Sequence, residues 1–274
     1  MKTKSKNILN SIIAWFILCL FVFPIFWLIT SSFKTPNDIF TIPPKLLSFE
    51  WDFSSYSTVF GRTPLVQYIK NSLIICSSSV TISIVLGTFA AYAFSRFNIK
   101  RSKDLSFWII SVRMAPPIVA IVPLFILINK IGLYDSHISL ILIYLMFNIP
   151  FAVWMMRGYL SQIPVELDEA ARIEGCSHFI TFFKIIFPLI KTGVITTAIM
   201  SFIFSWNEFF FAFLLTGRNA KTVPVGISGY ITQTGIRWDE LTTAGTVILI
   251  PILVLSLFAS KHFIKGLMEG ALKD

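Results

Sequence analysis

Few residues of this chain have the types and spacing that catalysis requires. The three histidines lie far apart, and Cys19, Cys76 and Cys176 show no CxxC or paired spacing. Neither a metal site nor a disulfide framework is therefore expected. The chain also lacks GxxxxGK[ST], HExxH and GxSxG, the motifs that bind nucleotide phosphates, hold zinc or present a nucleophilic serine. We expect no catalytic residues, no bound metal and no cofactor on this chain.

Two ionisable residues, Arg113 and Glu208, lie within or beside long apolar runs. Charged side chains inside a membrane are costly unless they are paired or hydrated. Such residues therefore line a solute pathway, form an internal salt bridge or contact a partner subunit. Glu208 follows Trp206 and Asn207, and an aromatic ring beside groups that donate and accept hydrogen bonds suits a sugar. We take these four residues as candidates for a substrate pathway, with packing as the alternative role of Trp206.

The composition places these residues in a membrane. Hydrophobic residues make up 55% of the 274 residues, charged residues 14%, and the mean hydropathy is +0.76. Soluble domains carry about 25% charged residues, and a helix needs about 20 apolar residues to cross a bilayer. Six continuous apolar runs meet that length, so the sequence predicts an all-α integral membrane protein with six transmembrane helices. The runs cover roughly 8–31, 68–95, 105–128, 137–159, 192–215 and 241–262.

The basic residues indicate an orientation rather than a nucleic-acid surface. They lie in short stretches between the apolar runs and form no patch on a soluble face, so no nucleic-acid partner is expected. If the N-terminus is cytoplasmic, 14 of the 23 Lys and Arg residues fall in inner segments, eight in outer segments, and Arg113 within a span. Cytoplasmic loops carry the excess of such residues. We therefore expect both termini in the cytoplasm. We also expect 8–31 to be the first transmembrane span and not a cleaved signal peptide.

One polar connection, between the fourth and fifth runs, is too long to be a turn. Acidic residues favour a helix start at 166–169, Gly175 is a natural stop, and Ser177 can cap a second helix that Pro188 interrupts. The segment is thus predicted to be helix–glycine–helix, lying along the cytoplasmic surface. Taken alone, this pattern also fits an amphipathic interfacial helix that merely connects two spans.

The spacing in this connection resembles a known motif. Glu169-Ala170-Ala171, Gly175, Ile185 and Phe187-Pro188 are similar to the EAA loop of binding-protein-dependent ABC importers, which usually has Leu where this chain has Phe187. Over almost its whole length the chain resembles the six-helix permease of the maltose-transporter type. The supporting stretches are Asn71-Ser72, Arg113 to Pro117, Trp206 to Phe209, Thr222 to Gly226 and Gly266 to Ala271.

This resemblance implies a type I ABC importer permease fold in the bacterial inner membrane. Its regions would be an N-terminal helix with an external segment (1–67), a transmembrane domain (68–262) with the EAA loop at 161–190, and a cytoplasmic tail (263–274). The EAA loop would form a coupling helix, docked on an ATPase through Glu169, Ala170, Ala171, Gly175 and Pro188. The connection 216–240 would reach the solute-binding protein.

The same resemblance implies the partners and the cargo. The chain would pair with a second permease subunit and two ABC ATPase subunits, which would hold the ATP and Mg. An extracytoplasmic binding protein would deliver a sugar or related polyhydroxylated solute. The alternative is an ion-coupled secondary transporter without an ATPase. That class usually shows buried acidic residues in several helices and a repeated half, and neither is evident in the sequence.

The predicted orientation is testable through Cys176, which it places in the cytoplasm. A membrane-impermeant thiol reagent should leave Cys176 unlabelled in intact cells and label it after permeabilisation. Efficient labelling in sealed cells would contradict the orientation.

Overall fold

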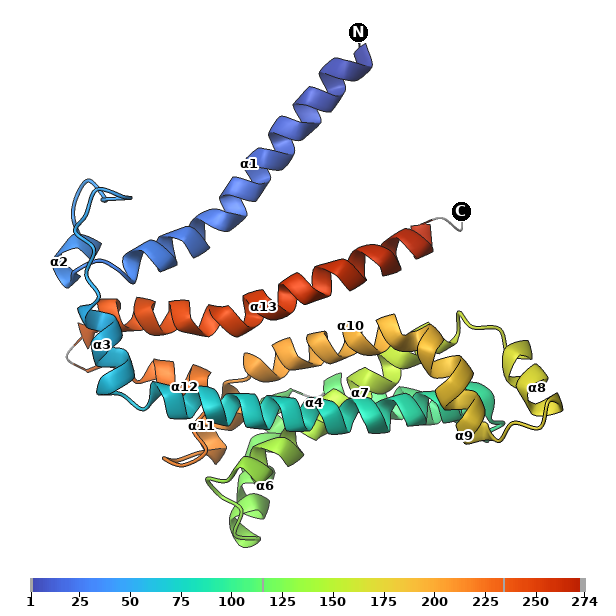
Figure 1. The fold of residues 1–274 in the computed structure, drawn as a ribbon. Helices are drawn as coiled ribbons and strands as arrows, with labels where there is room; N and C mark the ends of the chain where they lie inside the picture. Colours follow the sequence, from blue (N-terminus) through green and yellow to red (C-terminus); the bar gives the residue numbers. More distant parts are fainter. Residues whose placement is uncertain (1, 115, 234, 272–274) are drawn as a thin grey trace. The chain divides into compact units, whose positions relative to one another are not determined.

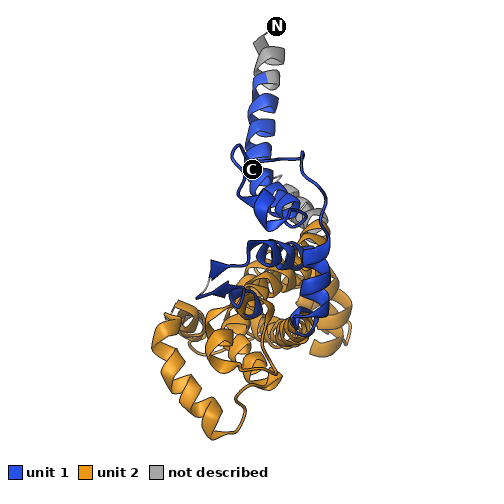
Figure 2. Cartoon of the chain, turned by 90° about the vertical axis from the view of Figure 1, so that its left-hand side faces the viewer, with its two compact units in different colours: residues 1–67, 226–250 blue, residues 68–225, 251–274 orange. Residues whose placement is uncertain are grey.

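The computed structural model describes residues 2–114, 116–233 and 235–271. Within these ranges the chain is mostly helical (Figure 1). It divides into two compact units, coloured separately in Figure 2. The first comprises residues 1–67 and 226–250, and the second comprises 68–225 and 251–274. Each unit is described by itself below.

Five helices of the described chain are long and apolar enough to cross a membrane. They are α1 (Lys2–Ser31), α4 (Leu65–Arg96), α7 (His137–Leu160), the helix His178–Trp206 that ends with α10 (Phe187–Trp206), and α13 (Trp238–Ala271). A bent pair, α5 (Ser102–Met114) and α6 (Pro117–Lys130), supplies a sixth span if it is counted as one. The all-α membrane architecture predicted from the sequence is therefore confirmed.

The third predicted span is not one straight helix. Its two halves, α5 and α6, meet at 88°. The sequence there is Ala115-Pro116-Pro117, and Ala115 lies outside the described residues. Proline lacks the backbone N–H that an α-helix needs, and it disfavours helical geometry in the residue before it. Two consecutive prolines therefore account for the bend.

The prediction that Pro188 interrupts the helix is wrong. The chain passes from α9 (His178–Thr181) through a π-helical turn, η1 (Phe182–Ile186), into α10, with Pro188 in the first turn of α10. The Phe187 N–H donates to the carbonyl of Phe182, five residues earlier. This wide turn separates the proline ring from the carbonyl with which it would clash in a regular α-helix. The second helix of the predicted helix–glycine–helix is therefore continuous with the fifth span, which starts at His178 and not at about residue 192.

The connections between the long helices also contain short regular elements. Residues 32–67 include α2 (Pro36–Ile39) and α3 (Ser54–Gly61), and the stretch 223–236 includes α12 (Val223–Ser228) and a hairpin of β1 (Ile231–Thr232) and β2 (Gly235–Ile236). The two strands are antiparallel, with Ile231 opposite Ile236. These elements are too short for hydrophobic periodicity to reveal them.

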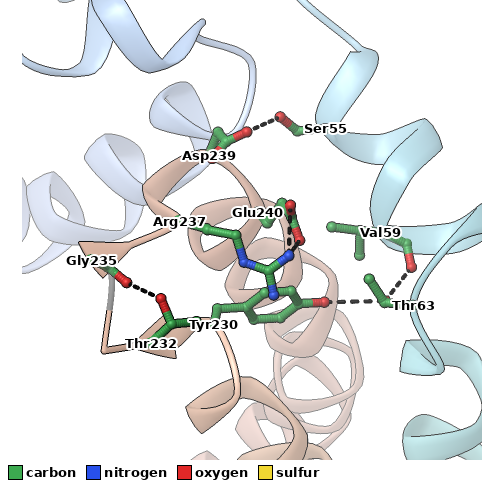
Figure 3. A network of polar contacts seen from close by, with 9 residues as sticks. All are labelled: Ser55, Val59, Thr63, Tyr230, Thr232, Gly235, Arg237, Asp239 and Glu240. Carbon is green, nitrogen blue, oxygen red and sulfur yellow. Dashed lines mark hydrogen bonds and ion pairs between the residues drawn. The ribbon is translucent and has the colours of Figure 1, made fainter.

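A polar network holds the first unit together around the start of α13 (Figure 3). The Arg237 guanidinium bonds Glu240 at 3.0 Å and lies 5.1 Å from the centre of the Tyr230 ring. The Tyr230 hydroxyl lies 3.2 Å from that of Thr63. The Ser55 hydroxyl donates to Asp239 at 3.1 Å. The network thereby ties α3 to the residues on either side of the hairpin.

The second unit is organised around α7, against which α4, α5 and α10 pack. At one point α4 approaches α7 so closely that only glycine fits. A Cβ on Gly87 would lie 2.5 Å from the Cβ of Ala152, which is itself fully buried. Towards the C-terminal end of α4 an apolar core follows. Its buried members are Ala91, Tyr92, Met156, Leu160, Phe182, Ile186 and Ile190.

The close approach at Gly87 yields a stability prediction. Gly87→Ala places a methyl group in a filled space, so we expect it to destabilise the protein by about 1–3 kcal/mol. Gly158→Ala in α7 is the matched control, because nothing lies within 4 Å of a Cβ built there. Thermal unfolding in detergent is the measurement. Equal melting temperatures for the two variants would contradict the described contact.

Candidate functional site

The connection between α7 and α9 folds as helix–glycine–helix, as the sequence predicted. Its first helix, α8 (Glu166–Ile173), begins with three acidic residues and ends just before Gly175, whose φ is +86°. The N–H of Cys176 donates to the carbonyl of Ala171 at 3.0 Å, closing the helix end in the way that left-handed glycines permit. Ser177 then caps α9 by accepting from the N–H of Ile180. We call residues 161–181 the coupling segment.

The predicted coupling residues do not all face the same way. Glu169, Ala170 and Gly175 are exposed, whereas Ala171 is 3% exposed and packs against its own chain. Pro188 is exposed and lies in α10, beyond the coupling segment. Ile173 on the same short helix is 87% exposed, although sequence reasoning did not single it out. The outward surface of α8 therefore combines a carboxylate, a small residue and an aliphatic side chain.

Sequence reasoning missed the group that holds this segment in place. Asp168 accepts from the Tyr92 hydroxyl and from Arg96 Nε, each at 2.7 Å. Arg96 Nη2 also donates to the carbonyl of Ile163 at 3.0 Å. The side chains of Arg96 and Asp168 are only 5% and 9% exposed. We call Tyr92, Arg96 and Asp168 the inner anchor, because together they fasten α8 to the C-terminal end of α4 (Figure 1).

The inner anchor is energetically significant because it is buried. Removing one partner of a buried ion pair leaves an uncompensated charge and costs about 3–5 kcal/mol. The Tyr92 ring also packs edge-on against Phe182, with ring centres 5.0 Å apart, so this residue belongs both to the apolar core and to the ionic contact. Any displacement of α8 must therefore move α4 or break these bonds.

The fifth span breaks where a candidate pathway residue lies. Helix α10 ends at Trp206, and a short helix, α11 (Phe210–Leu215), follows. The Glu208 carboxylate accepts from the N–H groups of Phe211 and Ala212 at 2.9 and 3.1 Å, and from the Tyr144 hydroxyl at 3.1 Å. Such bonds satisfy the free N–H groups at a helix start. Through these bonds the Glu208 side chain holds the start of α11 against α7.

The other three candidate pathway residues do not converge with Glu208 on one site. Trp206 is 1% exposed and stacks on Phe202 at 5.6 Å, the packing role given as its alternative. Asn207 is exposed and donates to the carbonyl of Ile203 at 2.8 Å. The Arg113 guanidinium lies 4.4 Å and 4.7 Å from the ring centres of Phe151 and Phe204.

Neither Arg113 nor Glu208 forms a salt bridge within the described residues. The aromatic faces around Arg113 provide cation–π stabilisation, and its Nη1 is buried without a hydrogen-bond partner there. Across the same residues no group of three or more His, Cys, Asp or Glu side chains gathers to hold a metal ion. Trp206 Nε1 is likewise buried without a partner among the described residues, and of the four candidates only Asn207 is exposed.

A second polar cluster lies at the opposite end of α4. The Asp135 carboxylate accepts from the backbone N–H groups of residues 217–220, at 2.8 to 3.1 Å. Burial opposes ionisation of this carboxyl, but the four N–H donors together outweigh it and hold the pKa of Asp135 below its usual range. Asp135 itself has a left-handed backbone, with φ of +56°. The loop that begins at residue 216 is therefore firmly seated.

Asn71 and Ser72 bind the same loop from α4. Asn71 Nδ2 donates to the carbonyls of Asn219 and Lys221 at 2.8 and 2.9 Å, and Ser72 Oγ accepts from the Val223 N–H at 2.9 Å. The Asn71 Oδ1 also lies 2.8 Å from His137 Nε2. Both α4 side chains are almost completely buried. We call Asn71 and Ser72 the outer anchor.

Comparison with known proteins identifies the family of this chain. The family model of the binding-protein-dependent transport system inner membrane component matches residues 83–269. The chain is 33% identical over 260 residues to a probable ABC transporter permease, y4oR, of Sinorhizobium fredii, covering 94% of this chain and 93% of that protein. It is 34% identical over 261 residues to the trehalose/maltose transport system permease MalG of Thermococcus litoralis, covering 94% of this chain and 92% of that protein.

A solved structure agrees on the fold. It is described as a bacterial ABC transporter involved in the import of the acidic polysaccharide alginate. It superposes with a TM-score of 0.79 at 21% identity, over 96% of this chain and 98% of that one. The region that the family model matches contains α7, the coupling segment, the broken fifth span and the C-terminal part of α4, from residue 83 on. The chain therefore belongs to the family of inner membrane components of binding-protein-dependent transport systems.

Proposed function

We propose that this chain is a permease subunit of a binding-protein-dependent ABC importer for a sugar or a related polyhydroxylated solute. The observation that carries the proposal is the coupling segment, whose helix–glycine–helix geometry presents Glu169, Ala170 and Gly175 on the surface of a chain that belongs to this family. The comparisons support import by a binding-protein system rather than the ion-coupled alternative.

The class of solute follows from the relatives. Among them are permeases named for trehalose and maltose, for diacetylchitobiose and for sulfoquinovosyl glycerol. All of these solutes carry many hydroxyl groups. Asn207 is exposed at the break of the fifth span, and its amide can both donate to and accept from hydroxyl groups. We assign Asn207 to the solute pathway and Glu208 to positioning α11.

The proposed assembly contains four kinds of chain. This permease pairs with a second permease in the inner membrane, and two ABC ATPase subunits bind ATP and Mg. An extracytoplasmic binding protein delivers the solute. Both termini and the coupling segment lie in the cytoplasm, in keeping with the excess of Lys and Arg in those segments. This chain carries no phosphate-binding loop, so hydrolysis belongs to the partner subunits.

In this assembly α8 is the contact with an ATPase. Glu169 offers a charge-assisted hydrogen bond, Ala170 allows close backbone approach, and Ile173 buries its exposed aliphatic side chain. Closure of the ATPases on ATP would displace α8 and switch the permease between its inward-facing and outward-facing states. Gly175 preserves the angle between α8 and α9, because φ near +86° strongly favours glycine.

The proposed ATPase contact is tested by Glu169→Lys combined with Gly175→Trp. We expect the variant to insert in the membrane. ATPase co-purification and solute uptake should each fall by about tenfold or more, because the charge at 169 is reversed and a large side chain enters the contact at 175. Gly132→Trp is the matched control. Gly132 also has a positive φ, and nothing lies within 4 Å of a Cβ built there. Full uptake by the well-expressed double variant would contradict the assigned role.

The pathway assignment is tested by comparing Asn207→Ala with Glu208→Gln. We expect Asn207→Ala to change the preference among a series of solutes while the complex stays assembled. Glu208→Gln should instead lower the thermal stability by about 1–3 kcal/mol, because an NH2 donor replaces one of the two acceptor oxygens and leaves buried donors unpaired. It should leave the preference unchanged. Uptake across the series and thermal unfolding of the complex are the measurements. The reverse pattern would contradict both assignments.

A further inference from the structure

We propose that α4 is the rod that transmits movement of the coupling segment to the loop at residues 219–223, with the inner and outer anchors as its two attachments. The inference rests on the proposed function, since it assigns the residues that carry the ATPase movement through this chain. The juxtaposition behind it is that one helix binds functional segments at both of its ends, through buried polar side chains.

The inner attachment grips the coupling segment at two points. Arg96 bonds the Ile163 carbonyl before α8 and Asp168 within it, while Tyr92 bonds the second oxygen of the same carboxylate. The two points bracket the start of α8, so the position of this helix relative to α4 is fixed. The exposed residues Glu169 and Ala170 take no part in these bonds and keep their surface for a partner.

The outer attachment is equally specific. Asn71 and Ser72 fix two carbonyls and one N–H within residues 219–223. The same loop is seated on Asp135 from the α6–α7 connection. A shift of the outer end of α4 therefore moves the loop or breaks bonds to buried groups, which costs about 1–3 kcal/mol for each group left unsatisfied.

The helix between the anchors is suited to act as a rod. Among the five long helices of the described chain, α1, α7 and α13 contain an internal proline, and the fifth contains the π-turn and Pro188. Helix α4 runs from Leu65 to Arg96 with neither. From Asn71 to Arg96 it spans about 38 Å at 1.5 Å per residue, more than the roughly 30 Å hydrocarbon core of a bilayer. A kink at a proline or a π-turn would absorb movement, and α4 has neither of these two causes.

If α4 transmits the movement, weakening either anchor should impair one measurable step. A helix can transmit movement between two segments only while both of its ends stay attached to them. Weakening either anchor should therefore reduce the stimulation of ATP hydrolysis by the loaded binding protein, even though the anchors lie at opposite ends of the helix. ATPase association should persist, because the outward surface of α8 is unchanged. A residue needed only for folding would instead lower assembly and basal hydrolysis together.

The mildest variants delete one hydroxyl each, Tyr92→Phe at the inner anchor and Ser72→Ala at the outer anchor. In the intact complex reconstituted in lipid, we expect each to lower binding-protein stimulation of hydrolysis by about two- to tenfold, the equivalent of one hydrogen bond. Basal hydrolysis and ATPase co-purification should stay at the wild-type level. Ser79→Ala is the matched control, because the one bond of this buried α4 hydroxyl among the described residues is to the Cys76 carbonyl of its own helix.

A double-mutant cycle then tests the ionic contact. Arg96→Gln and Asp168→Asn should each reduce stimulation more strongly than the hydroxyl deletions, and the double variant should be no worse than the more severe single variant, because the two residues act as a unit. Unchanged stimulation in Tyr92→Phe and Ser72→Ala would overturn the proposal, as would loss of ATPase co-purification in both. If the wild-type chain itself recruited no ATPase, the proposed function would fail instead, and the two failures are distinguishable.

Discussion

The carboxylate of Asp168 is the point on which the position of the coupling segment depends. It receives a tyrosine hydroxyl and an arginine side chain from α4 while it belongs to α8. A short helix of eight residues has little stability of its own in water. The buried contacts of Asp168 and Ala171 therefore hold α8 in place, and the residues between them remain free to meet a partner.

The bilayer imposes a related constraint on the membrane part of the chain. Polar groups there need partners inside the protein, because lipid offers none. Glu208 obtains them from Tyr144 and from the first N–H groups of α11, and Arg113 lies between two aromatic rings. A charged residue in a span can thus serve the architecture rather than the solute, which is why Glu208 is a weaker pathway candidate than its sequence position suggested.

The local features of the coupling segment were predictable, because helix caps depend on neighbouring residues. Gly175 and Ser177 act where the sequence indicated. The anchor between Arg96 and Asp168 was not predictable, since its members are 72 positions apart and charge alone does not pair them. The prediction that Pro188 interrupts its helix was wrong for a different reason. A π-turn accommodates the proline ring, and no residue pattern in a single sequence marks such a turn. The bend at Pro116 and Pro117 followed directly from proline chemistry, yet hydropathy merged both halves into one run.

The contact between Gly87 and Ala152 also bears on how this chain can change over generations. The added methyl group of an alanine at 87 would occupy the space that the side chain of Ala152 already fills. The residue tolerated at position 87 therefore depends on the residue at position 152. A larger residue at 87 requires the loss of the methyl group at 152 and a small shift of the α7 backbone, which lies 3.2 Å from the added Cβ. The two positions should therefore vary together or stay unchanged.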